Sequence, residues 1–253
     1  ALAFHPSFVV STDWAYEILL PSIGNETGAA LSKWALAGAL ILPQSILLGT
    51  TFPLMSAGLL RRYPLAPGES LSMLYFTNSL GAAVGVLASG FLLIESLGLP
   101  GTIQLAGALN LALAVAVWAL ARGREPNAAK EMNPAQMPDA QTSISWLLGI
   151  ALLTGTASFI YEIGWIRMLV LVLGASTHSF ELMLSAFILG LACGGLWIRS
   201  RIDRITHPLK FLGWVQIVMG LLALATIPTY IGMFDVMAAV IKGLAKTDTG
   251  HFM

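Results

Sequence analysis

The residues whose chemistry most needs explaining are ionised side chains inside apolar stretches. Glu162 lies in the run YEIGWIR, which extends from Tyr161 to Arg167, and Glu181 lies in the next apolar stretch. Glu162 and Arg167 are five positions apart, so they do not stack on one helix face. Each is therefore expected to find a partner on another helix. Glu181 is a candidate partner for Arg167. Three interpretations stay open: an interhelical ion pair near the outer membrane interface, a cavity-lining or proton-relay site, and side chains that reach the lipid headgroups.

Uncharged polar side chains form a second group inside the apolar stretches. They are Gln44, Tyr75, Asn78, Gln104 and Asn110. In a membrane such groups most often hydrogen-bond between helices, and they can also line a substrate cavity.

No familiar catalytic or metal-binding arrangement accompanies these residues. The four histidines show no ligand spacing, and Cys193 is the only cysteine, so we expect no metal site, no disulfide and an inert buried thiol. The sequence has no phosphate-binding glycine loop after a strand and no nucleophile elbow. We therefore expect no catalytic residue and no cofactor in this stretch. An enzymatic site would lie elsewhere or be an unfamiliar intramembrane one.

The composition is that of an integral membrane protein. Of 253 residues, 57% are hydrophobic and 10% are charged, and the mean hydropathy is +0.79. Soluble domains carry about 25% charged residues. The composition therefore excludes an ordinary soluble enzyme, a disordered protein and, because no basic face can be built, a nucleic-acid binder. The composition predicts the lipid bilayer as the partner of the chain.

An all-α bundle of about six membrane-spanning helices is the predicted fold. A helix needs about 20 apolar residues to cross a bilayer, and six stretches qualify: 31–60, 70–94, 99–121, 144–172, 178–200 and 209–232. The first contains Pro43 and Pro53, which predict a kink or break near 49–53.

Basic residues occupy alternate loops, which predicts the orientation. They are Arg61 and Arg62, then Arg122, Arg124 and Lys130, then Arg199, Arg201, Arg204 and Lys210. The loops at 95–98 and 173–177 contain none. The positive-inside rule places the basic loops in the cytoplasm, so we expect a multi-pass protein of a bacterial-type plasma (inner) membrane.

The same pattern predicts five segments along the chain. They are a non-cytoplasmic interfacial segment at 1–30, a three-helix group at 31–121, a cytoplasmic linker at 122–143, a second three-helix group at 144–232, and a non-cytoplasmic segment at 233–253 that we expect to be incomplete. The linker is rich in proline and polar residues, as flexible connections are.

Small residues at four-residue spacing predict how the helices pack. Lipid supplies no hydrophobic drive between helices, so close contacts of small side chains must hold them together. The predicted contact ridges are Gly81, Gly85 and Ser89; Ala186, Gly190 and Gly194 with Gly195; and Ala108, Ala112 and Ala116.

Several of these runs resemble one family. The run LTGTASFIYEIGWIR at 153–167 is similar to the opening helix motif of the membrane-bound spermidine synthase-like proteins, in which a major-facilitator-like membrane region is fused to a spermidine synthase domain. The runs LGAS at 173–176 and AFILGLACGG at 186–195 resemble that family's second helix. The runs LGTTFPL at 48–54 and LYFTNSLGAAVG at 74–85 resemble its later helices.

The resemblance implies half-repeats and a missing catalytic domain. The runs at 48–54 and 74–85 resemble the family's later helices, yet they precede the opening motif at 153–167. This order implies the end of one major-facilitator-like half followed by the start of the next, joined by the linker. The charged loop with Arg199, Arg201, Asp203 and Arg204 resembles the loop that forms cytoplasmic salt bridges after the second helix of such a half, although plain positive-inside anchoring explains it equally well. The family's aminopropyl transfer uses decarboxylated S-adenosylmethionine and a polyamine, and none of its catalytic positions lies in these residues.

Three functions follow as hypotheses. The chain is the membrane region of a spermidine synthase-like protein, anchoring or serving a catalytic domain. Alternatively, it is a transporter-like module with a substrate cavity near Glu162, Asn78 and Gln44. In the third, it is an accessory or scaffolding subunit of a larger complex with partner subunits.

Overall fold

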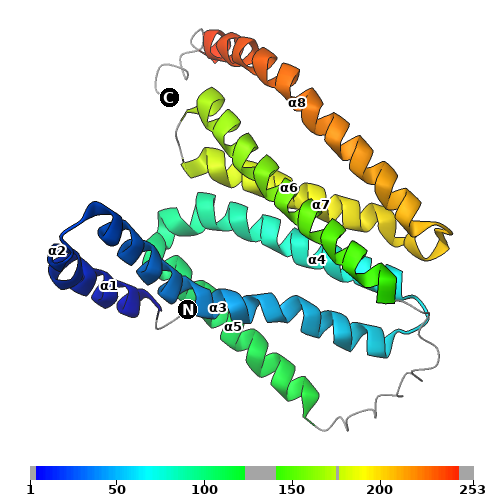
Figure 1. Ribbon diagram of the computed structural model, residues 1–253, viewed down its shortest axis with the longest axis horizontal. Helices are drawn as coiled ribbons and strands as arrows, with labels where there is room; N and C mark the ends of the chain where they lie inside the picture. The colour runs from blue at the N-terminus through cyan, green and yellow to red at the C-terminus, as the bar shows by residue number, and fades with distance from the viewer. Residues whose placement is uncertain (1–3, 123–140, 175–176, 245–253) are drawn as a thin grey trace. The chain divides into compact units, whose positions relative to one another are not determined.

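The computed structural model describes residues 4–122, 141–174 and 177–244, and all regular structure in these ranges is helical. Figure 1 shows the helices in chain order. Their bounds are α1 Phe4–Trp14, η1 Ala15–Leu19, α2 Leu20–Ser22, α3 Glu26–Arg62, α4 Pro67–Ala88, η2 Ser89–Leu93, α5 Ile94–Ala121, α6 Gln141–Leu173, α7 Thr177–Arg199, η4 Ile202–Arg204 and α8 Pro208–Leu244. Both η1 and η2 are π-helical turns, and η4 is a 3-10 turn. The predicted all-α class is confirmed.

The described chain is a multi-pass membrane protein by the length and apolarity of its helices. Five helices qualify: Glu26–Arg62, Pro67–Leu120, Ser145–Val172, Thr177–Arg199 and Pro208–Gly243. In the most apolar 18 residues of each helix, at most 22% of the residues are buried within the described structure. The outer surface of each helix is therefore apolar, as lipid contact requires.

The second of these helices is too long for one crossing. Its 54 residues correspond to about 80 Å, against a hydrocarbon layer of about 30 Å. The backbone leaves the helical conformation inside it at Gly98, whose φ is +68°, just before Pro100. Only glycine adopts this φ without strain. The prediction of six spans divides the chain at this point, and that count stays a prediction.

The chain forms two compact units. Unit 1 holds α1, η1, α2, α3 and α5, and unit 2 holds α4, α6, α7, η4 and α8. The two three-helix groups predicted at 31–121 and 144–232 follow chain order, whereas in the structure α4 belongs with the later helices. Residues 123–140 of the predicted linker and 245–253 of the last predicted segment lie outside the described residues.

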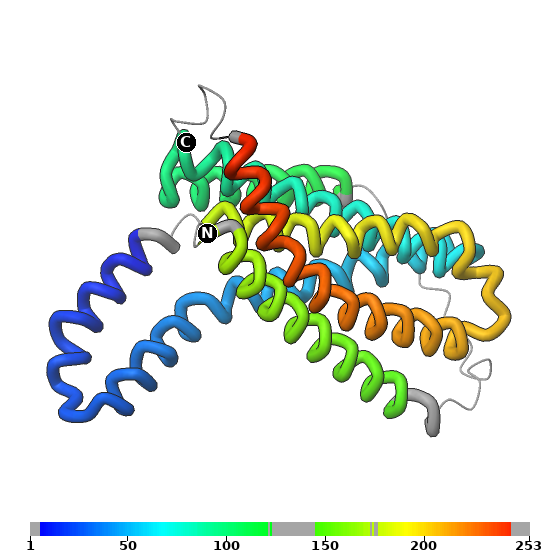
Figure 2. The backbone as a smooth tube through the Cα atoms, turned by 90° about the horizontal axis from the view of Figure 1, so that it is seen from above, coloured from blue at the N-terminus to red at the C-terminus, as the bar shows by residue number. Residues whose placement is uncertain are grey.

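In unit 1, α3 begins at a capped residue and continues through both of its prolines. The Asn25 side chain accepts a hydrogen bond from the Gly28 backbone amide, which caps the first turn. Of the kink or break predicted near 49–53, a break does not occur: α3 stays helical through both prolines, and its axis bends along its length (Figures 1 and 2). The Thr50 and Thr51 hydroxyls donate to the carbonyls of Leu47 and Leu48, 2.7 Å away in each case, so nearby backbone acceptors stay satisfied.

In unit 2, α4 and α7 lie antiparallel and form the most extensive contact. Glu69 at the start of α4 meets Arg199 at the end of α7, and Gly90 just after α4 meets Glu181 near the start of α7. Helix α8 continues to Leu244, twelve residues beyond the predicted end at 232. The described part of the segment predicted at 1–30 is largely helical and contains α1, η1, α2 and the start of α3.

Candidate functional site

The interface between α4 and α7 is built from small side chains. On α4 the buried residues are Ser72, Ser79 and Ala83, and on α7 they are Ser179, Met183, Ser185, Ala192 and Gly195. At Gly195 a β-carbon would lie 3.0 Å from Tyr75 Cδ1 and 3.4 Å from the Ser72 carbonyl oxygen. Only a residue without a side chain allows the two helices to approach this closely.

The predicted contact ridges differ from this interface. Four of the predicted ridge residues are exposed, and a β-carbon added at any of them would meet no other part of the described structure within 4 Å: Gly81, Gly85, Gly190 and Gly194. Of the predicted ridge residues on these two helices, Gly195 is buried in the contact. Cys193, expected to be buried, is exposed in the described structure. The two helices therefore meet on a different face from the one predicted.

One end of the α4–α7 pair is held by charged side chains. The Asp203 carboxylate accepts hydrogen bonds from the backbone amides of Gly68 and Glu69, at 3.0 and 2.9 Å, and so caps α4 from the loop after α7. The Arg199 guanidinium donates to Glu69 Oε1 through Nε and Nη2, at 3.0 and 2.9 Å. A negative charge at a helix N-terminus is favourable. This clamp, formed by Glu69, Arg199 and Asp203, ties the end of α7 to the start of α4.

The remaining loop arginines are arranged differently. Arg201 donates to the Trp197 carbonyl at 2.8 Å, and its guanidinium lies 5.1 Å from the centre of the Trp197 ring. Trp197 in turn stacks on Phe211 of α8, with ring centres 6.3 Å apart. Arg204 lies in the η4 turn and forms no ion pair with another described residue. Of the loop arginines, Arg199 therefore forms the interhelical salt bridge, with Glu69.

At the opposite end, Glu181 lies against the backbone of Gly90. A β-carbon at Gly90 would collide with the Glu181 carboxylate. Glu181 Oε2 lies 3.0 Å from His178 Nδ1, and the Glu181 side chain is only 14% exposed. Gly90 belongs to the π-helical turn η2, and single π-turns often occur at functional sites. Glu181 therefore has His178, three residues earlier, as its ionisable partner, and it is not paired with Arg167.

Aromatic side chains connect α6 with α7 and α8. Tyr161 stacks on Trp165 at 5.6 Å between ring centres, and Trp165 meets the Phe187 ring edge-on at 6.1 Å. Trp165 Nε1 lies 3.4 Å from Thr226 Oγ1 on α8. Gln216 of α8 also donates to the Thr154 hydroxyl of α6, at 2.8 Å. These polar contacts hold α8 beside α6.

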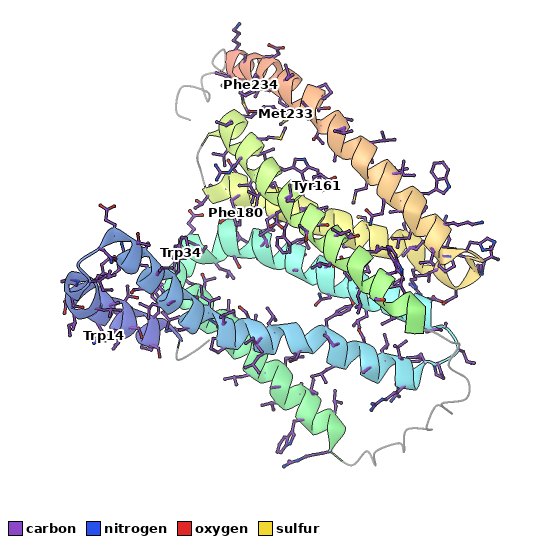
Figure 3. The ribbon with its side chains drawn as sticks, viewed as in Figure 1. Trp14, Trp34, Tyr161, Phe180, Met233 and Phe234 are labelled. Atoms are coloured by element: carbon purple, nitrogen blue, oxygen red, sulfur yellow. The ribbon has the colours of Figure 1, made fainter. Side chains whose placement is uncertain are left out.

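Trp165, Phe187 and Thr226 also line a cavity of about 850 Å³ between α6, α7 and α8. Figure 3 labels Met233 of α8, one of the lining residues, and Tyr161 of α6, one turn before the lining residue Trp165. Its lining is aromatic, aliphatic, methionine and hydroxyl in character: Trp165, Met168, Leu169, Leu182, Met183, Ala186, Phe187, Leu222, Ala225, Thr226, Thr229, Tyr230 and Met233. None of these residues is charged. We call it the three-helix cavity.

The other predicted site residues are scattered. Glu162 is half-exposed and Arg167 is exposed on α6, and neither forms an ion pair or hydrogen bond with another described residue. Asn78 on α4 is exposed, and it does not line the three-helix cavity. Gln44 lies on α3, in unit 1. Within unit 2, neither Glu162 nor Asn78 lines the three-helix cavity.

Two interactions were missed although the sequence carried signals for them. Glu69 follows Pro67 at the start of α4, and proline at the first helical position with an acid in the first turn is a helix-start signature. His178 and Glu181 are three residues apart, a spacing that brings side chains together on a helix. No comparable signal marks the lining of the three-helix cavity, because its residues also suit lipid-facing positions.

These features define a class: a multi-pass helical membrane protein with a tight antiparallel helix pair beside an uncharged cavity. No protein-family model matches the chain, and neither a curated protein nor a solved structure is significantly similar to it.

Proposed function

We propose that the chain is a transporter-like membrane module that binds a small, neutral and largely apolar substrate in the three-helix cavity. The observation that carries the proposal is the cavity itself. Its volume of about 850 Å³ lies within the roughly 300–1,000 Å³ typical of ligand pockets. Three membrane-length helices bound it, so a substrate there would be reached through the membrane region.

The lining indicates what kind of substrate fits. The Thr226 and Thr229 hydroxyls already donate to the carbonyls of Ala223 and Ala225. The Tyr230 hydroxyl forms no hydrogen bond with another described residue, so it is free to bind one polar group of a substrate. A polyamine would bring several positive charges into a cavity without a carboxylate, which is costly. The lining therefore favours a neutral molecule with one hydroxyl or carbonyl group.

A neutral, benzene-containing diazirine photoprobe tests this proposal on the full chain in proteoliposomes. We expect labelled peptides from α6, α7 and α8 around Trp165 and Tyr230. Ala186→Phe, which places a phenyl ring in the cavity, should lower this labelling. Leu224→Phe is the matched control, because Leu224 lies on α8 outside the lining and is 65% exposed. Equal labelling of both variants and the wild type would refute a specific site.

A second candidate concerns the larger protein of which this module would be part. The run at 153–167 favours the membrane region of a spermidine synthase-like protein, with major-facilitator-like half-repeats and six spans. Two aromatic residues of that run, Tyr161 and Trp165, stack on each other. Aminopropyl transfer with decarboxylated S-adenosylmethionine would then belong to a domain outside these residues. Aminopropyltransferase activity of the protein encoded by the full reading frame would support this candidate, and its absence would count against it.

Location, orientation and partners belong to the same proposal. The clamp of Glu69, Arg199 and Asp203 lies with the arginine-rich loops, which the positive-inside rule assigns to the cytoplasm of a bacterial-type plasma membrane. An accessory role would instead require partner subunits. Stoichiometric copurification of such subunits from the native membrane, lost in Gly81→Leu, would favour that alternative, because Gly81 is exposed on α4.

A further inference from the structure

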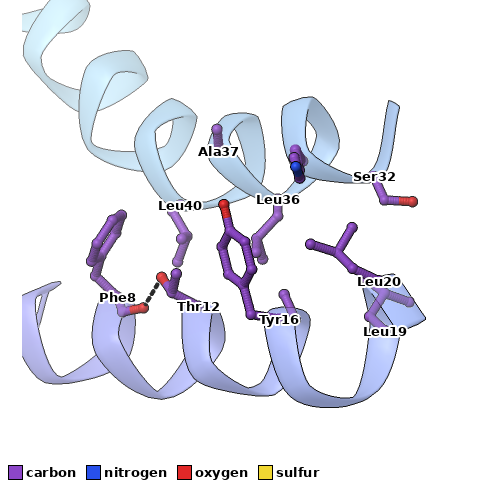
Figure 4. A pocket seen from close by; sticks show the side chains of 11 residues that line it. Phe8, Thr12, Tyr16, Leu19, Leu20, Ser32, Leu36, Ala37 and Leu40 are labelled. Carbon is purple, nitrogen blue, oxygen red and sulfur yellow. Dashed lines mark hydrogen bonds between the residues drawn. The ribbon is translucent and has the colours of Figure 1, made fainter. Parts of the chain in front are cut away.

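A second, smaller cavity lies in unit 1, where the N-terminal helices fold back along α3. Its volume is about 160 Å³, and it lies between α1, η1 and α2 on one side and the first turns of α3 on the other. Figure 4 shows Leu36 and Leu40 of α3 facing Phe8 and Tyr16 of the N-terminal segment. The Thr12 hydroxyl is turned to the Phe8 carbonyl, so it adds no free donor to the wall. The interior of this cavity is therefore apolar.

The side chains around the cavity are typical of a membrane–water interface. Trp14, Tyr16 and Trp34 are 50%, 58% and 75% exposed, and Figure 3 labels the two tryptophans. Exposed tryptophan and tyrosine collect at the level of the lipid headgroups. Lys33 is the eighth residue of α3, about 10 Å from the helix start. A lysine at this depth can extend its ammonium to the headgroup layer.

Lys33 lacks an anionic partner in the described part of the chain. It is the only lysine or arginine among the first 60 residues. Its ammonium lies 5.6 Å from the centre of the Tyr16 ring, and no described carboxylate forms an ion pair with it. Ser32, beside it, also lines the cavity. The lining of this cavity, which we call the slot, thus includes one cation, Lys33, and two residues with hydroxyl groups, Ser32 and Tyr16.

We propose that this slot binds one phospholipid, with an acyl chain between the N-terminal helices and α3 and the phosphodiester at Lys33. The slot is smaller than the roughly 300–1,000 Å³ of a pocket that encloses a whole ligand. It therefore suits part of a flexible chain whose headgroup stays outside. Lysine is a common phosphate partner in proteins, and the slot supplies the apolar surface that selects a lipid over free phosphate.

The surrounding charges indicate which headgroup fits. Residues 4–40 carry Asp13, Glu17 and Glu26 against Lys33, a net charge of −3 + 1 = −2 with histidine neutral. A purely anionic lipid meets an acidic surface there. A headgroup with a primary amine supplies its own positive charge, which complements the net negative charge of this segment. A choline headgroup has no N–H group. The slot therefore fits a phosphatidylethanolamine.

Native mass spectrometry of the full chain in detergent tests this proposal, with dioleoyl phosphatidylethanolamine, phosphatidylcholine and phosphatidylglycerol added separately. We expect one tightly retained phosphatidylethanolamine and weaker retention of the other two lipids. Lys33→Gln should weaken binding about tenfold, the loss expected for one charge-assisted contact, and Lys33→Arg should restore most of it. Equal retention of all three lipids, or no effect of Lys33→Gln, would overturn the proposal.

Filling the slot provides an independent arm that leaves the cation in place. Ala37 lines the cavity, so Ala37→Phe should displace the acyl chain and lower retention as much as Lys33→Gln. Ala39→Phe is the matched control, since Ala39 is exposed on the same helix outside the lining. Both variants should keep the wild-type thermal midpoint in phosphatidylcholine. Retention that falls equally in both variants would show that the slot is not the binding site.

Discussion

The close approach of α4 and α7 at Gly195 makes a prediction whose size follows from the geometry. A β-carbon there would lie 3.0 Å from Tyr75 Cδ1, closer than the 3.5–4.0 Å at which carbon atoms pack. Gly195→Leu adds three further carbon atoms at a site bounded on its other sides by the backbone of Ser72 and Phe76. Overpacking of this kind costs about 1–3 kcal/mol.

Thermal unfolding of the full chain in detergent measures this cost. For a protein of this size, 1 kcal/mol corresponds to about 2–4 °C in Tm, so overpacking should lower the Tm of Gly195→Leu by about 2–12 °C relative to a glycine-to-leucine change at an open position of the same helix. Gly190→Leu on the same helix is the control, because nothing lies within 4 Å of that position in the described structure. Leucine is a better helix former than glycine, by up to about 1 kcal/mol, so this control should keep or raise Tm. Equal Tm values for the two variants would refute the α4–α7 interface.

Two further predictions concern the ends of the same helix pair. Gly90→Ala should give a lower Tm than Gly85→Ala, because its added methyl group forces the Glu181 side chain to move, whereas the space around Gly85 is open. Asp203→Ala removes the cap of α4 and should cost about 0.5–2 kcal/mol, while Arg204→Gln in the same turn should be neutral. Both comparisons are read from thermal midpoints, and a control that falls as far as its test variant would contradict the assigned contact.

The membrane class and the helix positions were predictable because hydropathy reports them directly. The spans predicted at 144–172 and 178–200 agree closely with α6 and α7. The last span was predicted too short because Asp235 and Lys242 end the apolar stretch, but a helix needs only its backbone hydrogen bonds to continue. The sequence predicts a kink or a break near 49–53, and α3 remains one helix there, because a proline removes one backbone donor and the rest of the backbone hydrogen bonds persist.

The contacts between helices were harder to predict. Glycine, alanine and serine occur on more than one face of α4 and α7, so their spacing did not reveal which face meets the partner helix. The four-residue spacing predicts Gly81 and Gly85 as contact residues, whereas Ser79 and Ala83 are the buried ones. The three-helix cavity depends on where three helices diverge, and no single-helix periodicity carries that information.

Single-cysteine accessibility in sealed vesicles is the most direct test of the central claim, a chain that crosses the membrane repeatedly with its basic loops on one side. In a Cys193→Ser background, a membrane-impermeant maleimide should label Arg62→Cys and Ser200→Cys from one side. It should label Glu95→Cys and Thr177→Cys from the other, all four positions being exposed. Labelling of all four positions from the same side would contradict the account.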